Sequence, residues 1–301
     1  MGFFASLINS MPSAVAQGLI WGIMAIGVYL TYRILDVADL TVDGSLGTGG
    51  AVCVVMVLNG APVGLALLAA TAAGMLAGLV TGLFHTACGI PAILAGILTQ
   101  LALYSVNLRI MGFGTGGGKA NLPISVDKYG LLVSARYVRN VALNNPILIL
   151  TIFCAVLIAV LYWFFGTELG CSLRATGATK VLGLMISNGL VALAGGLLAQ
   201  YQGFSDINMG RGAIVIGLAA VIIGEVIFSR IFRNFALKLL SAVIGAIIYY
   251  IVMVFVLRLG LSTDDLKLLT ALVVALFLTI PYWKGKYFTK TSVKKGEKNH
   301  A

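Results

Sequence analysis

The chain has 301 residues, of which 60% are hydrophobic and only 10% are charged, with a net charge of +10 and a mean hydropathy of +1.03. A soluble domain carries about a quarter charged residues, so the composition excludes an ordinary soluble globular protein. We expect an all-α polytopic membrane protein, because helices satisfy their own backbone hydrogen bonds in lipid.

Long uncharged segments follow one another along most of the chain. About twenty apolar residues, rising 1.5 Å each, match the ~30 Å hydrocarbon core of a bilayer. We therefore expect about eight full crossings, at 14–33, 63–84, 90–108, 146–165, 181–201, 212–228, 237–257 and 267–283. Together they would form one transmembrane domain over residues 1–283.

The segment 38–59 departs from this pattern because acids and several glycines interrupt it. Irregular backbone at membrane depth is tolerated only where protein or a water-filled cavity covers it, so we expect a broken or re-entrant segment. Asp36, Asp39 and Asp43 are expected at the outer membrane interface. There they would act as helix caps and ion-pair partners, for instance of Arg33 or Arg211, or as functional acids facing a cavity.

The loop 109–145 has a helical pattern of its own. Asp127 can cap a helix that carries basic residues away from its apolar face. That face would contain Leu131, Leu132, Ala135, Val138 and Ala142. We expect this helix to lie on the outer membrane surface.

Residues 284–301 form a basic tail that contains six lysines. Lys and Arg stay on the cytoplasmic side, which predicts a cytoplasmic C-terminus, and eight crossings would put the N-terminus on the same side. Segments 166–180 and 229–236 would then face the cytoplasm. The tail favours contact with anionic membrane lipid over nucleic acid.

Few residues offer catalytic or metal chemistry. His85 and His300 are the only histidines, and the four cysteines lack metal-binding spacing. Residues 113–120 are similar to a phosphate-binding loop, but Phe113 stands where that loop needs Gly and Ala120 where it needs Ser or Thr. We expect no catalytic residue, no metal and no cofactor.

A polar corner at 201–210 separates two uncharged segments, 181–200 and 212–224. Such a corner suggests a mouth or gate that meets a ligand or partner. Polar residues in or beside these segments would either line a polar path or form satisfied interhelical hydrogen bonds. Glu225 is expected to pair with Arg230 or Arg233.

The two halves of the chain are weakly similar to each other. Each has a Gly-Leu pair, a tyrosine, one or two aspartates and a glycine-containing run, with unequal spacing. The first set is Gly18-Leu19, Tyr32, Asp36, Asp39 and the run to Ala51, and the second is Gly189-Leu190, Tyr201, Asp206 and Gly210–Ala213. Transporters are often built from repeats, with the substrate path between them.

Four segments resemble a known family: LTVDGSLGTGGAV (40–52), GIPAILAGILTQLALYSVNLRIMG (89–112), SNGLVALAGGLLAQYQGFSDINMG (187–210) and AAVIIGEVIF (219–228). They are similar to the permease subunit of bacterial ABC importers, in the branched-chain amino acid/ribose class and its tryptophan/aromatic amino acid-like branch. The resemblance covers about residues 14–283. It implies a homodimeric pore in the plasma membrane, two cytoplasmic ATPase subunits and an extracytoplasmic binding protein.

The resemblance and the expected topology together assign candidate roles. The translocation path would include Asp43, Gly44, Gln100, Asn188, Tyr201 and Gln202. Glu168 and Arg174 would contact the ATPase, and Asp206 and Arg211 would contact the binding protein. ATP hydrolysis would belong to the partner subunits, so the chain itself would not be an enzyme.

The loop 166–180 departs from the family. The resemblance implies a coupling helix here, and two to three turns need about 8–11 residues. After Leu173–Gly177 the loop passes almost directly into the next crossing. Either the native chain has further residues here, or it couples weakly to an ATPase.

Two other functions remain open at this stage. A stand-alone, ion-coupled secondary transporter would need acids in the middle of the membrane, whereas the acids here are expected at its edges. A structural membrane scaffold would transport nothing. The cargo is expected to be a small polar solute, with an aromatic amino acid favoured by the family branch and branched-chain amino acids, sugars or nucleosides as alternatives.

Overall fold

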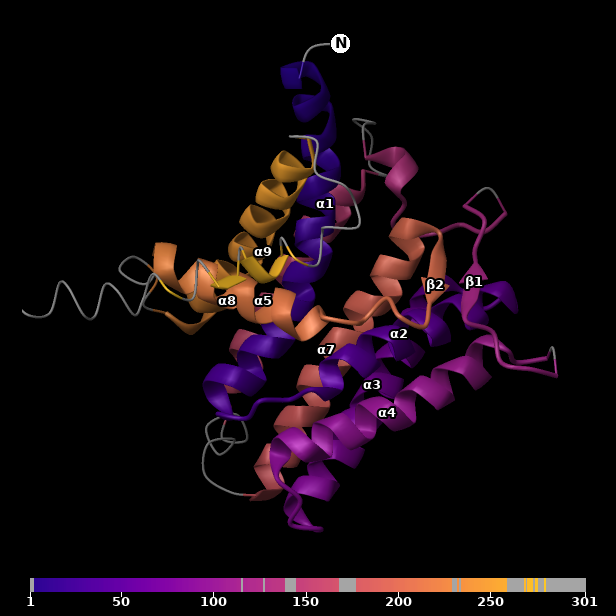
Figure 1. Cartoon of the computed structure of the whole chain (residues 1–301), viewed down its shortest axis with the longest axis vertical. Coiled ribbons are helices and arrows are strands. Elements are labelled where there is room, and N and C mark those ends of the chain that lie inside the picture. Colours follow the sequence, from indigo (N-terminus) through magenta and orange to yellow (C-terminus); the bar gives the residue numbers. More distant parts are fainter. Residues whose placement is uncertain are drawn as a thin grey trace, which may run out of the picture.

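The computed structural model describes residues 3–114, 116–126, 128–138, 145–167, 177–228, 232 and 234–258, with isolated positions between 268 and 279. This part of the chain is a bundle of helices with one small two-stranded sheet (Figure 1). The long helices are α1 (Phe3–Tyr29), α2 (Thr41–Leu58), α3 (Val63–Thr86), α4 (Ala92–Met111), α5 (Pro146–Phe165), α7 (Gly177–Gln202), α8 (Ala213–Phe228) and α9 (Phe235–Arg258). A π-helical turn (Leu30–Ile34) extends α1, a 3-10 turn spans Ala135–Tyr137, and the strands are β1 (Asn121–Pro123) and β2 (Phe204–Asp206).

Seven helices in the described part of the chain are long and apolar enough to cross a membrane, and α8 is a shorter apolar helix. The first seven predicted crossings correspond to α1, α3, α4, α5, α7, α8 and α9, which confirms an all-α polytopic membrane protein. The predicted crossing 267–283 and the basic tail lie almost entirely outside the described residues.

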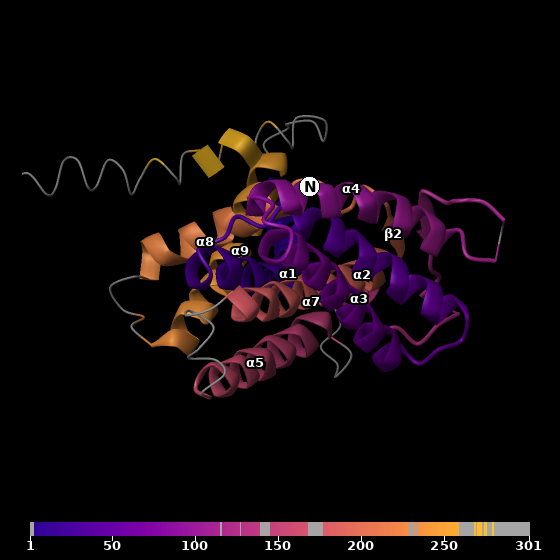
Figure 2. The ribbon, with the colours of Figure 1, turned by 90° about the horizontal axis from the view of Figure 1, so that it is seen from below.

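The helices α1 and α7 occupy the middle of the bundle, whereas α5 lies at its edge (Figure 2). In the apolar membrane-spanning stretch of α7, 78% of the residues are buried inside the bundle, compared with 17% in that of α5. Glycines make the central contacts close: Gly49 of α2 lies against the Ala192 backbone, and Gly195 of α7 lies against the Leu46 backbone. Small residues in lipid allow this approach, so the glycines of α2 form a helix–helix interface.

The segment 38–59 is therefore not broken. From Thr41 onward it is a regular helix, and only residues 35–40 before it are irregular. We expected the glycines to interrupt the helix, but covering α2 with α7, α3 and α4 turns them into contact positions. The fold thus has one more membrane helix than expected in this region.

The pairs α1–α2 and α7–α8 run in opposite directions. Ser13 and Tyr201 meet at one end of α1 and α7 (3.0 Å between hydroxyl oxygens), and Ser187 donates to the Gly27 carbonyl further along, so these two helices are antiparallel. In each pair an irregular polar segment turns back after the long helix, and a shorter helix begins inside the bundle. This arrangement gives the weak sequence repeat an inverted structural counterpart.

The additional helix changes the expected side of the N-terminus. Because α1 is antiparallel to α7, the start of α1 lies at the end where α7 finishes and where the described residues of the loop 109–145 lie. We expected it on the opposite side, together with 166–180. The error comes from omitting α2 from the crossings.

The loop 109–145 contains no long surface helix in its described residues. Residues 128–134 are non-helical, and a single 3-10 turn follows. Val133 and Val138 are buried in the main core, so tertiary packing overrides the apolar periodicity. Earlier in the loop, β1 pairs with β2 in antiparallel register, with Leu122 opposite Ser205.

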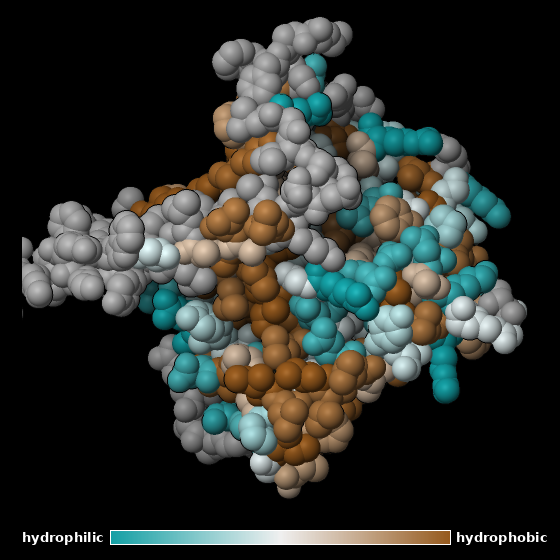
Figure 3. Space-filling view, in the orientation of Figure 1, coloured by the Kyte–Doolittle hydropathy of each residue, from teal (hydrophilic) through white to brown (hydrophobic). Residues whose placement is uncertain are grey.

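The surface hydropathy fits this arrangement. Figure 3 shows broad hydrophobic areas over the part of the face that carries α4, and hydrophilic residues around β1 and β2. Exposed apolar side chains occur on α3, α4 and α5, for example Leu68, Leu101 and Trp163. Exposed apolar helix faces are expected where lipid or another subunit covers them.

Candidate functional site

Two helices begin inside the bundle, close to the middle of α7. The amide of Thr41, the first residue of α2, donates to Asp39 Oδ1 (2.9 Å). Asn188, near the middle of α7, donates to Asp39 Oδ2 (2.6 Å). Asp39 is therefore buried at mid-depth and held by neutral donors, not at the outer interface where we expected it.

Asp43 holds the start of α8. Its two carboxylate oxygens accept from the Gly212 amide (2.9 Å) and the Ile214 amide (3.0 Å). These amides belong to the first turn of a helix, where backbone donors lack intrahelical partners and the helix dipole favours a negative charge. The expected role as a cap is thus confirmed for Asp43, but the cap lies on α8 inside the bundle.

One face of α4 turns its polar side chains toward this point. Gln100, Tyr104 and Asn107 follow each other at spacings of four and three residues, which places them on one side of the helix. Asn107 is 2% exposed and donates through Nδ2 to the Gly44 carbonyl (3.4 Å). Its Oδ1 is buried and accepts no hydrogen bond from any described residue.

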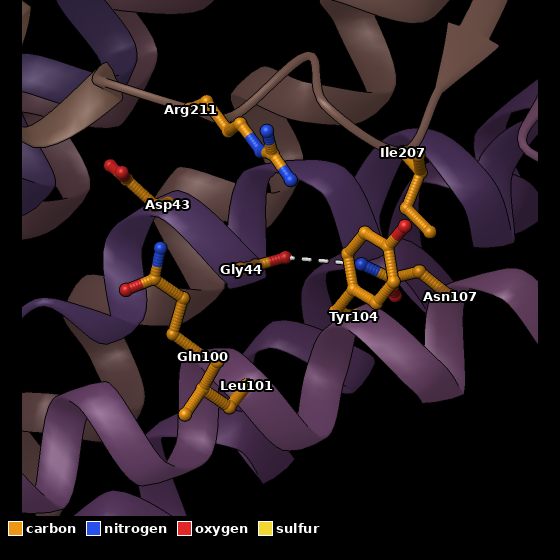
Figure 4. A pocket seen from close by; sticks show the side chains of 8 residues that line it. All are labelled: Asp43, Gly44, Gln100, Leu101, Tyr104, Asn107, Ile207 and Arg211. Carbon is orange, nitrogen blue, oxygen red and sulfur yellow. Dashed lines mark hydrogen bonds between the residues drawn. The ribbon is translucent and has the colours of Figure 1, made fainter.

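These elements enclose a pocket of about 290 Å³. It lies between the start of α2, the polar face of α4 and the segment that leads into α8 (Figure 4). Its lining residues are Asp43, Gly44, Gln100, Leu101, Tyr104, Asn107, Ile207 and Arg211. The volume is at the lower end of the ~300–1,000 Å³ range of small-molecule sites.

The pocket is lined by one arginine, Arg211, which forms no ion pair within the described part of the chain. Figure 4 shows the Arg211 guanidinium pointing into the space above α4, while the Asp43 carboxylate turns away from it. Among the described residues the ion pair that occurs is Arg33–Glu225, and Arg211 has no such partner. Because Asp43 is engaged with α8, Arg211 has no carboxylate partner among the described residues.

The pocket opens along the outer side of α4. Leu101 is 65% exposed and Tyr104 is 43% exposed, although both line it. An unpaired arginine close to the middle of a membrane helix is costly in contact with lipid. This side must therefore be covered by water or by another protein surface.

Three of the predicted path residues lie together in this pocket, namely Asp43, Gly44 and Gln100. Asn188 lies elsewhere: it is fully buried, accepts from the Ser45 hydroxyl (2.6 Å) and donates to Asp39 and to the Leu184 carbonyl (3.0 Å). Its hydrogen-bonding groups are occupied, so it joins α2 to α7 and does not line the pocket.

Apart from Arg211, the other predicted residues lie away from Asp43, Gly44 and Gln100 or outside the described residues. Tyr201 is buried and bonds to Ser13, and Gln202 is exposed at the end of α7. Asp206 lies in β2, and its carboxylate accepts from the side-chain amide of Asn121 (3.2 Å). Arg211, predicted beside it as a binding-protein contact, lines the pocket instead. Glu168 and Arg174 lie outside the described residues.

Our sequence interpretation missed four lining residues, namely Leu101, Tyr104, Asn107 and Ile207. A detectable signal existed for two of them, because Tyr104 and Asn107 share a helix face with Gln100 in an otherwise apolar crossing. The position of Ile207 depends on how segment 203–212 folds back, which has no local sequence signal.

A bidentate ion pair lies at the opposite end of α8. Arg33, in the π-helical turn after α1, donates through Nε to Glu225 Oε1 (2.8 Å) and through a terminal nitrogen to Oε2. Glu225 was expected to pair with Arg230 or Arg233, and Arg33 with one of the aspartates. The close packing of α1 against α8 brings Arg33 and Glu225 together instead. The short helix α8 therefore connects the pocket to an ion pair near the other surface.

Comparisons with known proteins agree with this architecture. The family model described as "Branched-chain amino acid transport system / permease component" matches residues 10–280. The chain is 39% identical over 284 residues to the tyrosine transport system permease protein of Clostridioides difficile, covering 90% of each chain. It is 36% identical over 289 residues to an uncharacterized protein of Rickettsia prowazekii, covering 90% of this chain and 97% of the other. No solved structure is significantly similar to it.

Proposed function

The chain belongs to the branched-chain amino acid transport permease family, the membrane components of ABC importers, and from this premise we propose that it passes an amino acid across a bacterial plasma membrane in an ATP-driven importer. Permeases of this family are not catalytic, and ATP hydrolysis belongs to separate subunits. The chain spans the membrane several times, as its apolar helices and its family both indicate.

The observation that supports this function best is the pocket between α2, α4 and the start of α8. It lies at the middle of α4, it is lined by polar and charged groups, and two helices begin beside it. In transporters, helices that begin at mid-depth commonly mark the substrate site. An amino acid on its way through the membrane would pass this pocket.

The proposed cargo is an amino acid, with tyrosine as the first candidate. A relative that shares 39% identity carries tyrosine transport in its name. The pocket combines Arg211 and Gln100 with the apolar or aromatic side chains of Leu101, Tyr104 and Ile207. Polar groups suit the ends of an amino acid, and the apolar surface suits a side chain such as tyrosine's.

A second copy of the chain would close the open side of the pocket. Leu101 and Tyr104 are exposed on α4, and lipid is a poor neighbour for the adjacent Arg211. A homodimer with α4 at its interface would turn the two pockets toward a shared path. This arrangement supports the homodimeric pore that the family resemblance implies.

The two ends of the bundle suit different partners. We place the ATPase subunits at the end that carries residues 166–180, with Glu168 and Arg174 as contacts and the basic tail on the same, cytoplasmic side. The binding protein would dock at the other end, near Asp206 and the β1–β2 sheet. Rocking of α8 between its ion pair and the pocket would link the two.

The position of two acids favours one alternative function, a stand-alone secondary transporter. Asp39 and Asp43 lie at mid-depth, as such a transporter requires, and not at the membrane edges. Both carboxylates, however, accept hydrogen bonds from helix starts and a buried amide. They hold helix starts, which leaves the importer as the better-supported function.

Purification of the tagged chain from its native membrane in mild detergent tests the proposed function. Mass spectrometry should then identify an ABC ATPase in a stoichiometric amount. The reconstituted complex should take up amino acid only when ATP is supplied. Uptake by the purified chain alone, driven by an ion gradient, would contradict the importer and support the secondary transporter.

A further inference from the structure

We propose that the pocket recognises the headgroup of a free α-amino acid, with Arg211 binding the carboxylate and Asn107 Oδ1 accepting from the ammonium. This inference rests on the proposed function and goes beyond it. The permease would then select the amino acid a second time, after the binding protein, and would not be a passive passage.

The carboxylate half of this site follows from the charge of Arg211. Its guanidinium points into the pocket and has no ion-pair partner among the described residues (Figure 4). The nearby acid, Asp43, is engaged by the Gly212 and Ile214 amides. A guanidinium fork matches the geometry of a carboxylate and binds it through two parallel hydrogen bonds.

The ammonium half follows from the orientation of Asn107. The Gly44 carbonyl can only accept a hydrogen bond, so the amide nitrogen of Asn107 must face it. Oδ1 is then fixed as a buried acceptor without a partner in the described part of the chain, on a side chain that belongs to the lining of the pocket. Leaving such an atom unpaired is unfavourable, and a bound donor would recover that cost.

The combination of a cation and a buried acceptor selects a zwitterion. A simple anion such as phosphate would pair with Arg211 but would leave Asn107 Oδ1 without a donor. An amine that lacks a carboxylate would leave the positive charge of Arg211 without a partner. A free amino acid satisfies both groups, and Gln100 beside them can donate or accept through its amide.

The test is equilibrium binding to the full-length chain in lipid nanodiscs, without ATPase or binding protein. The probes are radiolabelled L-tyrosine and L-leucine, which share the headgroup. The competitors are L-tyrosine methyl ester, which lacks the carboxylate charge, and 3-(4-hydroxyphenyl)propionate, which lacks the ammonium. The wild-type chain should bind L-tyrosine at least about tenfold more tightly than either analogue.

The variants assign each half of the site. Arg211→Gln should weaken L-tyrosine about 10- to 100-fold and change the methyl ester by no more than about threefold, because the ester has already lost the interaction. Arg211→Lys should keep part of the affinity. Asn107→Leu should weaken L-tyrosine and its ester but not the propionate. Arg109→Gln, on α4 but outside the pocket, is the control and should bind as the wild type does.

Three outcomes would overturn the inference. The first is that Arg211→Gln and Arg109→Gln bind L-tyrosine with equal affinity. The second is that Arg211→Gln weakens the binding of L-tyrosine and of its methyl ester equally. The third is that the wild-type chain binds no amino acid although its complex imports amino acid. In the last case the importer function stands and the recognition site fails. If the complex imports no amino acid, the proposed function itself fails.

Discussion

At the scale of single residues, the acids near the start of α2 show how a charge is kept inside a membrane helix bundle. Asp39 and Asp43 each accept hydrogen bonds from the first amides of a helix, and no lysine or arginine neutralises them among the described residues. The exposed amides of a helix start carry partial positive charge, which stabilises a carboxylate. Asp43 thereby fixes where α8 begins, and so the position of one pocket wall.

Replacement of Asp43 by alanine should destabilise the protein by about 1–2 kcal/mol, the upper range for loss of a helix cap. Asp43→Asn should cost less, because one amide oxygen can still accept from the start of α8. Thermal unfolding in detergent, followed by fluorescence, measures both. Equal stability of the wild type and the alanine variant would contradict the capping role.

The sequence allowed us to predict only part of the site at this scale. Asp43, Gly44 and Gln100 were recognised by residue type, as polar or flexible positions in apolar segments. Asn188 looked equally suitable, because a single amide in an apolar helix gives the same signal whether it lines a path or bonds to a neighbour. Only the contact with Ser45 and Asp39 distinguishes the two.

At the scale of helices, glycine had a different meaning from the one we expected. In water-soluble proteins a glycine-rich stretch weakens a helix. In α2, Gly49 faces the backbone of α7 and Gly44 faces α4 at distances that exclude a Cβ atom, and the helix is regular throughout. Apolar length therefore located seven helices correctly, six of them long enough to cross a membrane, whereas composition misled us about α2, because packing decides its structure.

Gly195→Ala should disrupt the contact between α7 and α2, since the new methyl group would overlap the Leu46 carbonyl. Overpacking of this kind costs about 1–3 kcal/mol, and more where backbone must move. The control is Gly64→Ala in the first turn of α3, where a Cβ would meet nothing. It should be neutral or slightly stabilising, because alanine favours a helix. A thermal unfolding temperature that is the same for both variants would show that the contact is not tight.

At the scale of the whole molecule, the inverted pairs α1–α2 and α7–α8 place two helix starts together inside the bundle. The weak repeat in the sequence pointed to this arrangement without fixing its geometry. The predicted side of the N-terminus, by contrast, was wrong. Counting α2 as a further membrane helix moves the start of α1 to the opposite side of the membrane. The described ends of the helices now give an orientation that is directly testable.

Cysteine labelling tests this orientation. Cys88 is exposed between α3 and α4, at the end of the bundle that we assign to the cytoplasm, and Asn59 is exposed at the opposite end of α2. In a Cys171→Ser background, a membrane-impermeant maleimide should label Asn59→Cys in intact cells and leave Cys88 unlabelled. Cys53 and Cys154 are buried and should stay silent. Labelling of Cys88 before permeabilisation would reverse the orientation.

The central claim is that this chain passes an amino acid through the pocket beside α4 when its partner subunits use ATP. The most direct measurement is uptake of labelled L-tyrosine into proteoliposomes that contain the chain with its ATPase and binding protein. We expect uptake that requires ATP, falls about tenfold or more in Arg211→Gln, and is unchanged in Arg109→Gln. Uptake that proceeds without ATP, or that the two substitutions affect equally, would contradict the account.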